Sequence, residues 1–355
     1  MNYKIVRLNT RAKTSKTSSV LIIYTGGTLG MAYDESGALV PFNFGQILEK
    51  IPIINNLDVA ITVISFPSPI DSSNVSVLHW KDMAYIIYEN YDSYDGFVVL
   101  HGTDTMAYSA SMLSYMLKGL NKPVIFTGAQ LPISALRSDA RENLMSSLEI
   151  ATAKIDEKPI VPEVCIFFNH LLLRGNRSKK VQSVHFDAFE SENYSPLAES
   201  GIVIDYQLAA IRPYEPSKKL KLLNELDNRV MVLKLFPGIT DKIMDACFAI
   251  PDLRGVVLET YGSGNSPSES WFMKSLERAI AKGLIILNVS QCNGGRVIQG
   301  RYETSRELLN VGVVSGADMT TEAAVTKLMF LLGQSKDREE IRRKLTIPIA
   351  GEMTT

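Results

Sequence analysis

Residues 20–28 read Val-Leu-Ile-Ile-Tyr-Thr-Gly-Gly-Thr, and this stretch decides the fold class. Its apolar, β-branched run is short and closed by two glycines, which is typical of a buried strand. Gly26 and Gly27 tolerate positive φ and let a ligand or another backbone approach closely. Thr28 then stands past the carboxyl end of a strand, where open α/β sheets bind ligands. The alternative is a plain Gly-Gly turn, and the rest of the chain must decide between them.

Further apolar runs alternate with segments of helical spacing along the whole chain. This alternation is typical of a mostly parallel sheet flanked by helices, so the fold class is α/β. We expect further strands at 59–64, 97–100, 123–127, 164–168, 230–233, 255–258 and 284–287. Helices are expected between them, for example at 44–51, 80–91, 106–117 and 141–153. Pro67 and Pro69 predict a loop after the strand at 59–64.

A change in composition predicts two α/β domains, of which the first is larger. Residues 1–18 are expected to be a polar N-terminal tail, since termini of this composition are commonly disordered. Residues 19–207 then form an N-terminal catalytic domain with a mostly parallel sheet. Prolines and a cluster of lysines mark a linker at 208–228, and residues 229–355 form a smaller C-terminal domain.

Composition and charge favour an ordinary soluble protein. Lys and Arg number 37 against 38 Asp and Glu, so nothing points to nucleic acid or an anionic membrane. The three Cys and four His are scattered, without the spacing of a metal site or a disulfide framework. No apolar run approaches the ~18 residues of a membrane span, and no apolar segment precedes residue 20 as a secretory signal would. The cytoplasm is therefore the expected location.

Chemically useful side chains follow other strand ends. Thr103 and Asp104 come directly after the strand at 97–100, and a basic loop delivers Lys179 and Lys180. A threonine hydroxyl is a weak nucleophile until a base removes its proton. A lysine held by an aspartate can serve, which gives a Thr–Lys–Asp relay similar in logic to Ser–His–Asp. The competing interpretation is that the two lysines are a solvated pair.

Asp71-Ser72-Ser73 suits an amino-acid ligand. Short hydroxyls and exposed N–H groups hold an α-carboxylate, and a carboxylate holds an α-ammonium. The competing interpretation is a turn closed by local Asx and Ser hydrogen bonds. Three common motifs are absent: the dinucleotide GxGxxG, the P-loop, and the GxSxG elbow.

Two longer motifs resemble the signatures of the L-asparaginase family. They are Tyr-Thr-Gly-Gly-Thr-Leu-Gly-Met at 24–31 and Leu-His-Gly-Thr-Asp-Thr-Met-Ala-Tyr at 100–108. Arg-Gly-Asn-Arg at 174–177 and Gly-Ala-Asp-Met-Thr at 316–320 are similar to the cytoplasmic, type I branch. The resemblance covers nearly the whole chain from Val20 onward.

The resemblance implies hydrolysis of L-asparagine to L-aspartate and ammonia through an acyl-threonine intermediate, with no metal or organic cofactor. It implies that Thr28 is the nucleophile, that Thr103 and Asp104 assist it, and that Lys180 rather than Lys179 is the family's lysine. It implies homodimers or homotetramers whose sites are completed across an interface. The implied substrate-binding residues are Asp71, Ser72, Ser73, Asn265 and a tyrosine.

Two positions depart from the family pattern. Many relatives carry a tyrosine just after the glycine of the loop beyond Thr28, where this chain has Ala38 after Gly37; Tyr33 or Tyr302 would have to supply the phenol. Some type I members also have an allosteric asparagine site that uses an arginine and a threonine, and these positions are Glu259 and Lys179 here. A carboxylate there repels the effector's α-carboxylate, so we expect weak or absent activation by asparagine.

Two other functions stay open at this point. One is an amidotransferase subunit acting on an aminoacyl-tRNA, which would need an RNA-binding face. The other is a non-catalytic protein that binds an amino acid on the same scaffold, which would bind asparagine and release no ammonia.

Overall fold

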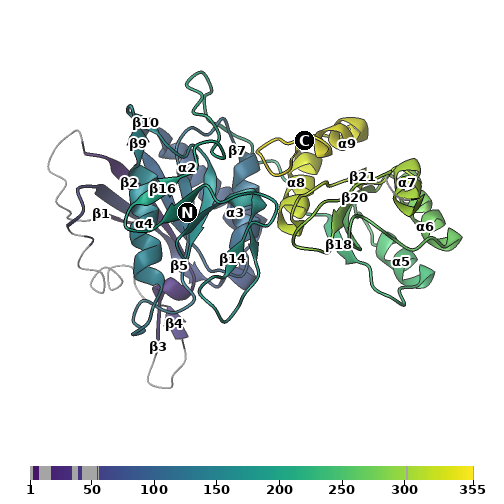
Figure 1. Cartoon of the computed structure of the whole chain (residues 1–355), viewed down its shortest axis with the longest axis horizontal. Helices are drawn as coiled ribbons and strands as arrows, with labels where there is room; N and C mark the ends of the chain where they lie inside the picture. The colour runs from purple at the N-terminus through teal and green to yellow at the C-terminus, as the bar shows by residue number, and fades with distance from the viewer. Residues whose placement is uncertain are drawn as a thin grey trace. The chain divides into compact units, whose positions relative to one another are not determined.

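The structure is a computed structural model that describes residues 3–7, 17–33, 39–41, 54, 56–300 and 303–354. The chain divides into two compact units, Met1–Leu222 and Leu223–Thr355 (Figure 1). The division falls inside the stretch 208–228 in which the sequence predicts a linker. The helix expected at 44–51 lies outside the described residues.

The first unit contains a nine-stranded sheet in the order β1-β5-β2-β6-β8-β11-β12-β15-β16. Neighbours from β5 to β11 run parallel, and antiparallel strands complete both edges. The mixed but mainly parallel centre agrees with the alternation of strands and helices. The strands are β1 (Lys4–Arg7), β2 (Ser19–Gly26), β5 (Ala60–Ile70), β6 (Gly96–Leu100), β8 (Val124–Thr127), β11 (Val164–Phe168), β12 (Leu171–Arg174), β15 (Ala198–Ser200) and β16 (Ile204–Tyr206).

Helices cover both faces of this sheet. Alternate strand residues such as Val20, Ile22 and Val98 form one buried cluster with Leu144 and Leu148 of a helix. Since side chains alternate across a strand, the residues between them face the other way, toward two further helices that contact each other. The helices are α2 (Val77–Glu89), α3 (Met106–Met116) and α4 (Ala140–Thr152), and α4 is the one that carries the leucines.

Two details differ from the sequence-based expectations. β5 continues to Ile70 through Pro67 and Pro69. Its pairing with β2 breaks between Ser65 and Ile70, so the prolines sit at an irregularity where their missing N–H groups are not needed. In addition, the region expected to be a polar tail contains β1, which pairs antiparallel with residues 62–65 of β5.

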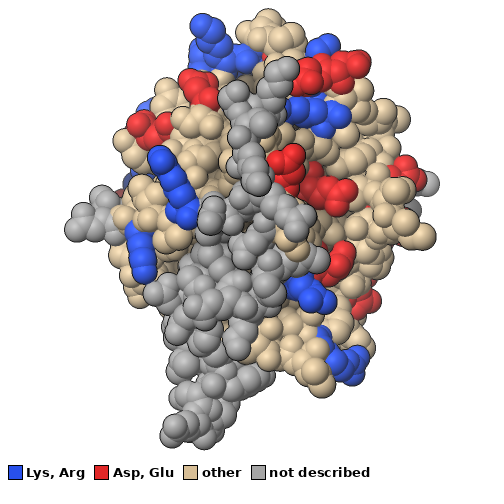
Figure 2. All heavy atoms as spheres, turned by 90° about the vertical axis from the view of Figure 1, so that its left-hand side faces the viewer, with Lys and Arg blue, Asp and Glu red and all other residues tan. Residues whose placement is uncertain are grey.

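On the face shown in Figure 2, Lys and Arg are interspersed with Asp and Glu among the described atoms.

Short elements connect the main ones in the first unit. The short elements are η1 (Thr28–Gly30), β3 (Met31–Tyr33), β4 (Leu39–Pro41), η3 (Ser72–Asn74), η4 (Tyr91–Ser93), β7 (Leu117–Lys118), β9 (Lys154–Ile155), β10 (Lys158–Pro159), η5 (Gly175–Arg177), β13 (Lys179–Lys180), β14 (Phe189–Glu190) and β17 (Lys221–Leu222).

The second unit is a smaller α/β layer with a parallel four-stranded sheet, β18-β19-β20-β21. Its core joins strand residues such as Val256 and Ile286 to Phe272 and Leu276 of a helix. The elements are β18 (Val230–Lys234), α5 (Asp241–Phe248), β19 (Gly255–Thr260), α6 (Ser270–Ala281), β20 (Ile285–Ser290), α7 (Glu303–Asn310), β21 (Val314–Ser315), α8 (Thr321–Gln334) and α9 (Arg338–Leu345).

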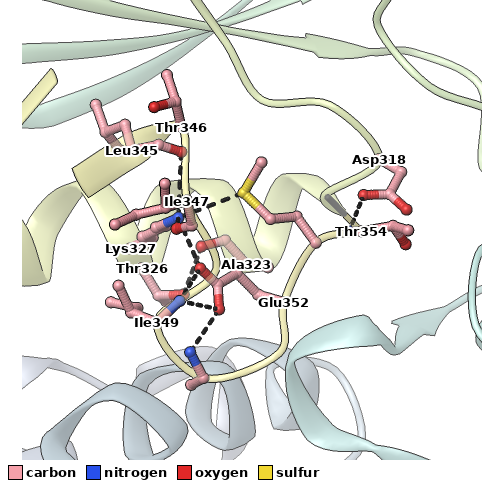
Figure 3. A network of polar contacts seen from close by, with 12 residues as sticks. Asp318, Ala323, Thr326, Lys327, Leu345, Thr346, Ile347, Ile349, Glu352 and Thr354 are labelled. Carbon is pink, nitrogen blue, oxygen red and sulfur yellow. Dashed lines mark hydrogen bonds and ion pairs between the residues drawn. The ribbon is translucent and has the colours of Figure 1, made fainter. Parts of the chain in front are cut away.

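A buried ion pair fastens the C-terminal segment to α8 (Figure 3). Lys327 Nζ lies 2.6 Å from Glu352 Oε1, and both side chains are 0% exposed. Lys327 also donates to the Ile347 carbonyl at 2.7 Å, and Glu352 Oε2 accepts from the Ala350 N–H at 2.8 Å. Burial lowers the pKa of Lys327, and the neighbouring Glu352 opposes that shift. The charges are thus compensated by each other and by backbone groups.

Candidate active site

Three loops meet at the carboxyl edge of the large sheet because their strands run parallel. Gly27 has φ of +88°, and a Cβ there would lie 2.5 Å from the Gly102 nitrogen. A Cβ on Gly102 would lie 2.6 Å from Ser72 Oγ. Only glycine fits such approaches. The loop after β2 is therefore packed backbone to backbone on the β6 loop, which in turn packs against the Ser72 side chain of the β5 loop, and the residues next to these glycines share one edge of the sheet.

Side-chain hydrogen bonds lock the same three loops. Thr105 Oγ1 donates to the Ser72 carbonyl at 2.7 Å, which joins the β6 loop to the β5 loop. Thr25 Oγ1 donates to the Leu100 carbonyl at 2.9 Å and is buried. The Thr25 hydroxyl is thus used inside the fold, whereas Thr28 follows it in η1 and is half-buried. This contrast favours Thr28 over Thr25 as the residue available for chemistry.

Lys180 connects the two polar groups of the β6 loop. Its Nζ lies 2.7 Å from Thr103 Oγ1 and 2.6 Å from Asp104 Oδ1. The lysine side chain is 17% exposed and the Asp104 side chain 64%. The structure thus brings together the Thr–Lys–Asp group from strand ends more than 70 residues apart. Lys179 has no ion pair or side-chain hydrogen bond with any part of the chain that is described.

The lysine loop is anchored from inside the protein. Arg174 Nε lies 2.7 Å from Glu163 Oε2, with both side chains nearly fully buried. A Cβ on Gly175 would lie 2.9 Å from the Ala110 methyl of α3, so the loop rests directly on that helix. The Arg-Gly-Asn-Arg segment therefore positions Lys180 through a buried ion pair and close helix packing.

Gln130 is a site residue that the sequence reasoning missed. It follows β8, and its Oε1 accepts a hydrogen bond from Thr103 Oγ1 at 3.2 Å. Its N–H group is held by Asp139, and its Nε2 donates to the His185 carbonyl at 3.0 Å. The sequence signal was that Gln130, like Thr28 and Thr103, lies in the short loop that follows a strand end. Before substrate binds, the Thr103 hydroxyl thus accepts a hydrogen bond from Lys180 and donates one to Gln130.

The Asp71-Ser72-Ser73 turn lies at the end of β5. Asp71 Oδ1 accepts from the Ser73 N–H at 3.0 Å and caps η3. This is the local hydrogen bond that the competing interpretation predicts. Ser72 is 4% exposed and faces the Gly102 backbone, whereas Asp71 and Ser73 are exposed. The turn is thus part of the same loop cluster, with two side chains open to solvent.

The other candidates belong to different parts of the chain. Asn265 lies in the second unit, where its backbone pairs with Tyr261 through two hydrogen bonds. Tyr302 lies outside the described residues, as do Gly37 and Ala38, and Tyr33 ends β3. Tyr24, which the sequence reasoning did not single out, donates to the Gly30 carbonyl at 3.2 Å, and burial raises its pKa to about 12. Tyr24 therefore supports the turn that carries Thr28.

Glu259, on β19 of the second unit, already has partners. Its Oε1 accepts from Thr321 Oγ1 at 2.5 Å, and Lys234 Nζ lies 3.9 Å from its Oε2.

Among the described residues, no group of three or more His, Cys, Asp or Glu is arranged to hold a metal ion. Within the same ranges, no helix has both the length and the apolar character to cross a membrane.

The fold and the site fit a family of amidohydrolases in both units. The "Asparaginase, N-terminal" family model matches residues 19–212, and the "Glutaminase/Asparaginase C-terminal domain" model matches residues 229–345. The chain therefore belongs to the asparaginase family.

Individual relatives agree over nearly the whole chain. L-asparaginase 1 of Escherichia coli K12 is 39% identical, and the match covers 95% of this chain and 98% of that one. The human protein named 60 kDa lysophospholipase is 40% identical over 94% of this chain, which spans 61% of that protein's length. The crystal structure of L-asparaginase I from Vibrio cholerae has a TM-score of 0.86 at 38% identity, covering 95% of this chain and 99% of that one.

Proposed function

We propose that the protein is an L-asparaginase that hydrolyses L-asparagine to L-aspartate and ammonia. The observation that carries this proposal is the position of Lys180 Nζ, which lies 2.7 Å from Thr103 Oγ1 and 2.6 Å from Asp104 Oδ1. The relatives named L-asparaginase support the same conclusion. The exposed groups of Asp71 and Ser73 hold the substrate's α-ammonium and α-carboxylate, with Ser72 backing the turn.

The reaction proceeds as two acyl transfers. Thr28 Oγ1 forms a bond to the side-chain carbonyl carbon of asparagine, and the C–N bond breaks. In this step Lys180 acts as the neutral amine: the Thr28 hydroxyl proton passes through Thr103 to Lys180 Nζ, and the resulting ammonium, held by Asp104, gives a proton to the leaving nitrogen, which departs as ammonia. Water then adds its hydroxyl to the ester carbon, the bond from that carbon to Thr28 Oγ1 breaks, and the water's other proton returns to Thr28 as L-aspartate leaves. A backbone N–H donor of the glycine loops that faces the oxyanion is worth about 3 kcal/mol.

The Thr28→Ala variant tests the assignment of the nucleophile. We expect it to keep its fold and to release almost no ammonia from L-asparagine, because the acyl acceptor is gone. The measurement is a coupled ammonia assay on wild type and variant, with circular dichroism and size-exclusion chromatography as controls of folding and assembly. Wild-type turnover by the variant would show that Thr28 is not the nucleophile. Hydrolysis of a lysophospholipid by the wild type, without ammonia from asparagine, would refute the proposed substrate.

We expect a hyperbolic dependence of the rate on asparagine concentration. Glu259 presents a carboxylate, already bound by Thr321, where an activating asparagine would need a cation for its own carboxylate. Initial rates over a wide concentration range check this expectation, and a clearly sigmoidal curve would contradict it.

We further propose that the protein acts in the cytoplasm as a homodimer or homotetramer, with Asn265 completing the site of a neighbouring chain.

A further inference from the structure

A row of buried, hydrogen-bonded polar groups lies behind the loop that carries Thr103. Trp80 Nε1 lies 2.9 Å from Ser109 Oγ, and Ser109 Oγ lies 2.9 Å from His101 Nε2. His101 Nδ1 in turn lies 2.7 Å from the Gly102 carbonyl oxygen. Trp80, Ser109 and His101 are 7%, 0% and 1% exposed. The row starts on α2, crosses α3, and ends on the peptide group that precedes Thr103.

The donor and acceptor capacity of each group determines the direction of every hydrogen bond in this row. A carbonyl oxygen only accepts, so His101 Nδ1 carries the hydrogen that Gly102 receives. In the neutral ring Nε2 is then an acceptor, and the Ser109 hydroxyl must donate to it. An indole N–H only donates, so Trp80 gives its hydrogen to Ser109 Oγ. The tautomer of His101 is thus fixed from both sides.

Holding the Gly102 carbonyl fixes the orientation of the next residue. In a trans peptide the N–H of Thr103 points away from the Gly102 carbonyl. Because His101 draws that carbonyl toward the α3 side of the sheet, the Thr103 N–H is turned away from it. The other flank is held by Ser72, against which Gly102 packs. The His101 ring therefore sets both the amide direction and the starting point of the Thr103 side chain.

We propose that His101 is a positioning residue of the reaction, clamped by Ser109 and Trp80 so that its Nδ1–H holds the Gly102–Thr103 peptide in its working orientation. This inference rests on the proposed L-asparaginase function. The two ring nitrogens of His101 are bound to the Gly102 carbonyl and Ser109, so the ring acts through the peptide group and not through its own proton.

The surroundings keep the ring in its neutral form. Burial lowers the pKa of His101 to about 4; the hydrogen bond to Gly102 opposes the shift, and the charge of His79 adds to it. Phe126 closes the pocket, with its ring edge-on to the imidazole at 5.8 Å between centroids. A charged ring would lose the bond that Ser109 donates to Nε2.

The first test compares two fully buried hydroxyls on different helices. Ser109→Ala removes the donor to His101, whereas Ser147→Ala removes an equally buried hydroxyl on α4 whose bond, at 2.6 Å, goes to the Asn143 carbonyl of the same helix. We expect kcat for L-asparagine to fall by about 10- to 100-fold in Ser109→Ala with KM little changed, because small misplacements of reacting groups cost this much. Ser147→Ala keeps the wild-type kcat at a matched loss of Tm. Equal kcat values for the two variants would overturn the proposal.

The second test does not depend on activity or on a variant. The chain has four histidines, so their ring nitrogens can be resolved by long-range ¹H–¹⁵N NMR on the ¹⁵N-histidine-labelled full chain. We expect the His101 ring to be neutral with its hydrogen on Nδ1 at pH 6. A hydrogen on Nε2, or a charged ring at that pH, would overturn the clamp. Absence of ammonia release by the wild type would refute the proposed function separately, and the NMR result would still decide the clamp.

Discussion

Replacing Lys180 by methionine is expected to lower kcat for ammonia release from L-asparagine by about 10²- to 10⁴-fold, the usual contribution of a positioned proton-transfer group. Lys180 carries the proton of the relay, with its Nζ 2.7 Å from Thr103 Oγ1 and 2.6 Å from Asp104 Oδ1. Methionine keeps a similar length and removes the amino group. The measurement is steady-state kinetics with the coupled ammonia assay.

The neighbouring lysine provides the matched control. Lys179→Met makes the same chemical change one residue earlier, on the same short strand, where the side chain has no partner among the described residues. We expect its rate to stay close to that of the wild type. A large loss of activity in Lys179→Met, with activity retained in Lys180→Met, would show that Lys179 and not Lys180 belongs to the relay.

Replacing Lys327 by methionine is expected to destabilise the second unit by about 3–5 kcal/mol, because it leaves the carboxylate of Glu352 buried without its partner. Both side chains are 0% exposed, so water cannot replace the lost contact. The bonds from Lys327 to the Leu345 and Ile347 carbonyls are lost as well. Native-state hydrogen exchange of α8 and the C-terminal segment, in the full chain, measures the effect.

Lys344→Met is the control for this prediction. Its ion pair with Glu340 is partly exposed in the same unit, and such pairs contribute roughly 0–1 kcal/mol. The double variant Lys327→Met/Glu352→Gln should regain part of the lost stability, since no buried charge remains unpaired. Equal protection in wild type and Lys327→Met would contradict the account of the C-terminal segment.

The sheet could be predicted largely from the sequence because its strands are short apolar runs between clear breakers. The Gly-Gly pair after β2 also indicated a close backbone approach, and Gly27 now proves to pack on Gly102. The edge strands were harder to predict. β1 reads Lys-Ile-Val-Arg; its Val6 is half-buried against the core, whereas its Ile5 is exposed. Pro67 and Pro69 obscured the continuation of β5. Such edges depend on pairing with distant residues, which local composition does not record.

The relay residues could be predicted by motif, but their mutual geometry could not. Nothing local to Lys179-Lys180 distinguishes the lysine that reaches Thr103; the strand β13 and the buried Arg174–Glu163 pair decide it. Gln130 and His101 escaped for the same reason. Each is an ordinary polar residue at a strand end, and its partner comes from a loop or helix elsewhere in the chain.

The most direct measurement of the central claim is a crystal structure of the protein with L-aspartate bound. We expect the side-chain carboxylate of aspartate to lie within about 2.6–3.2 Å of the Thr28 and Thr103 hydroxyls, with its α-groups at residues 71–73. Aspartate bound away from the loops that carry Thr28, Thr103 and Ser72, or with its side chain turned away from both threonines, would contradict the claim that these loops form one asparagine site.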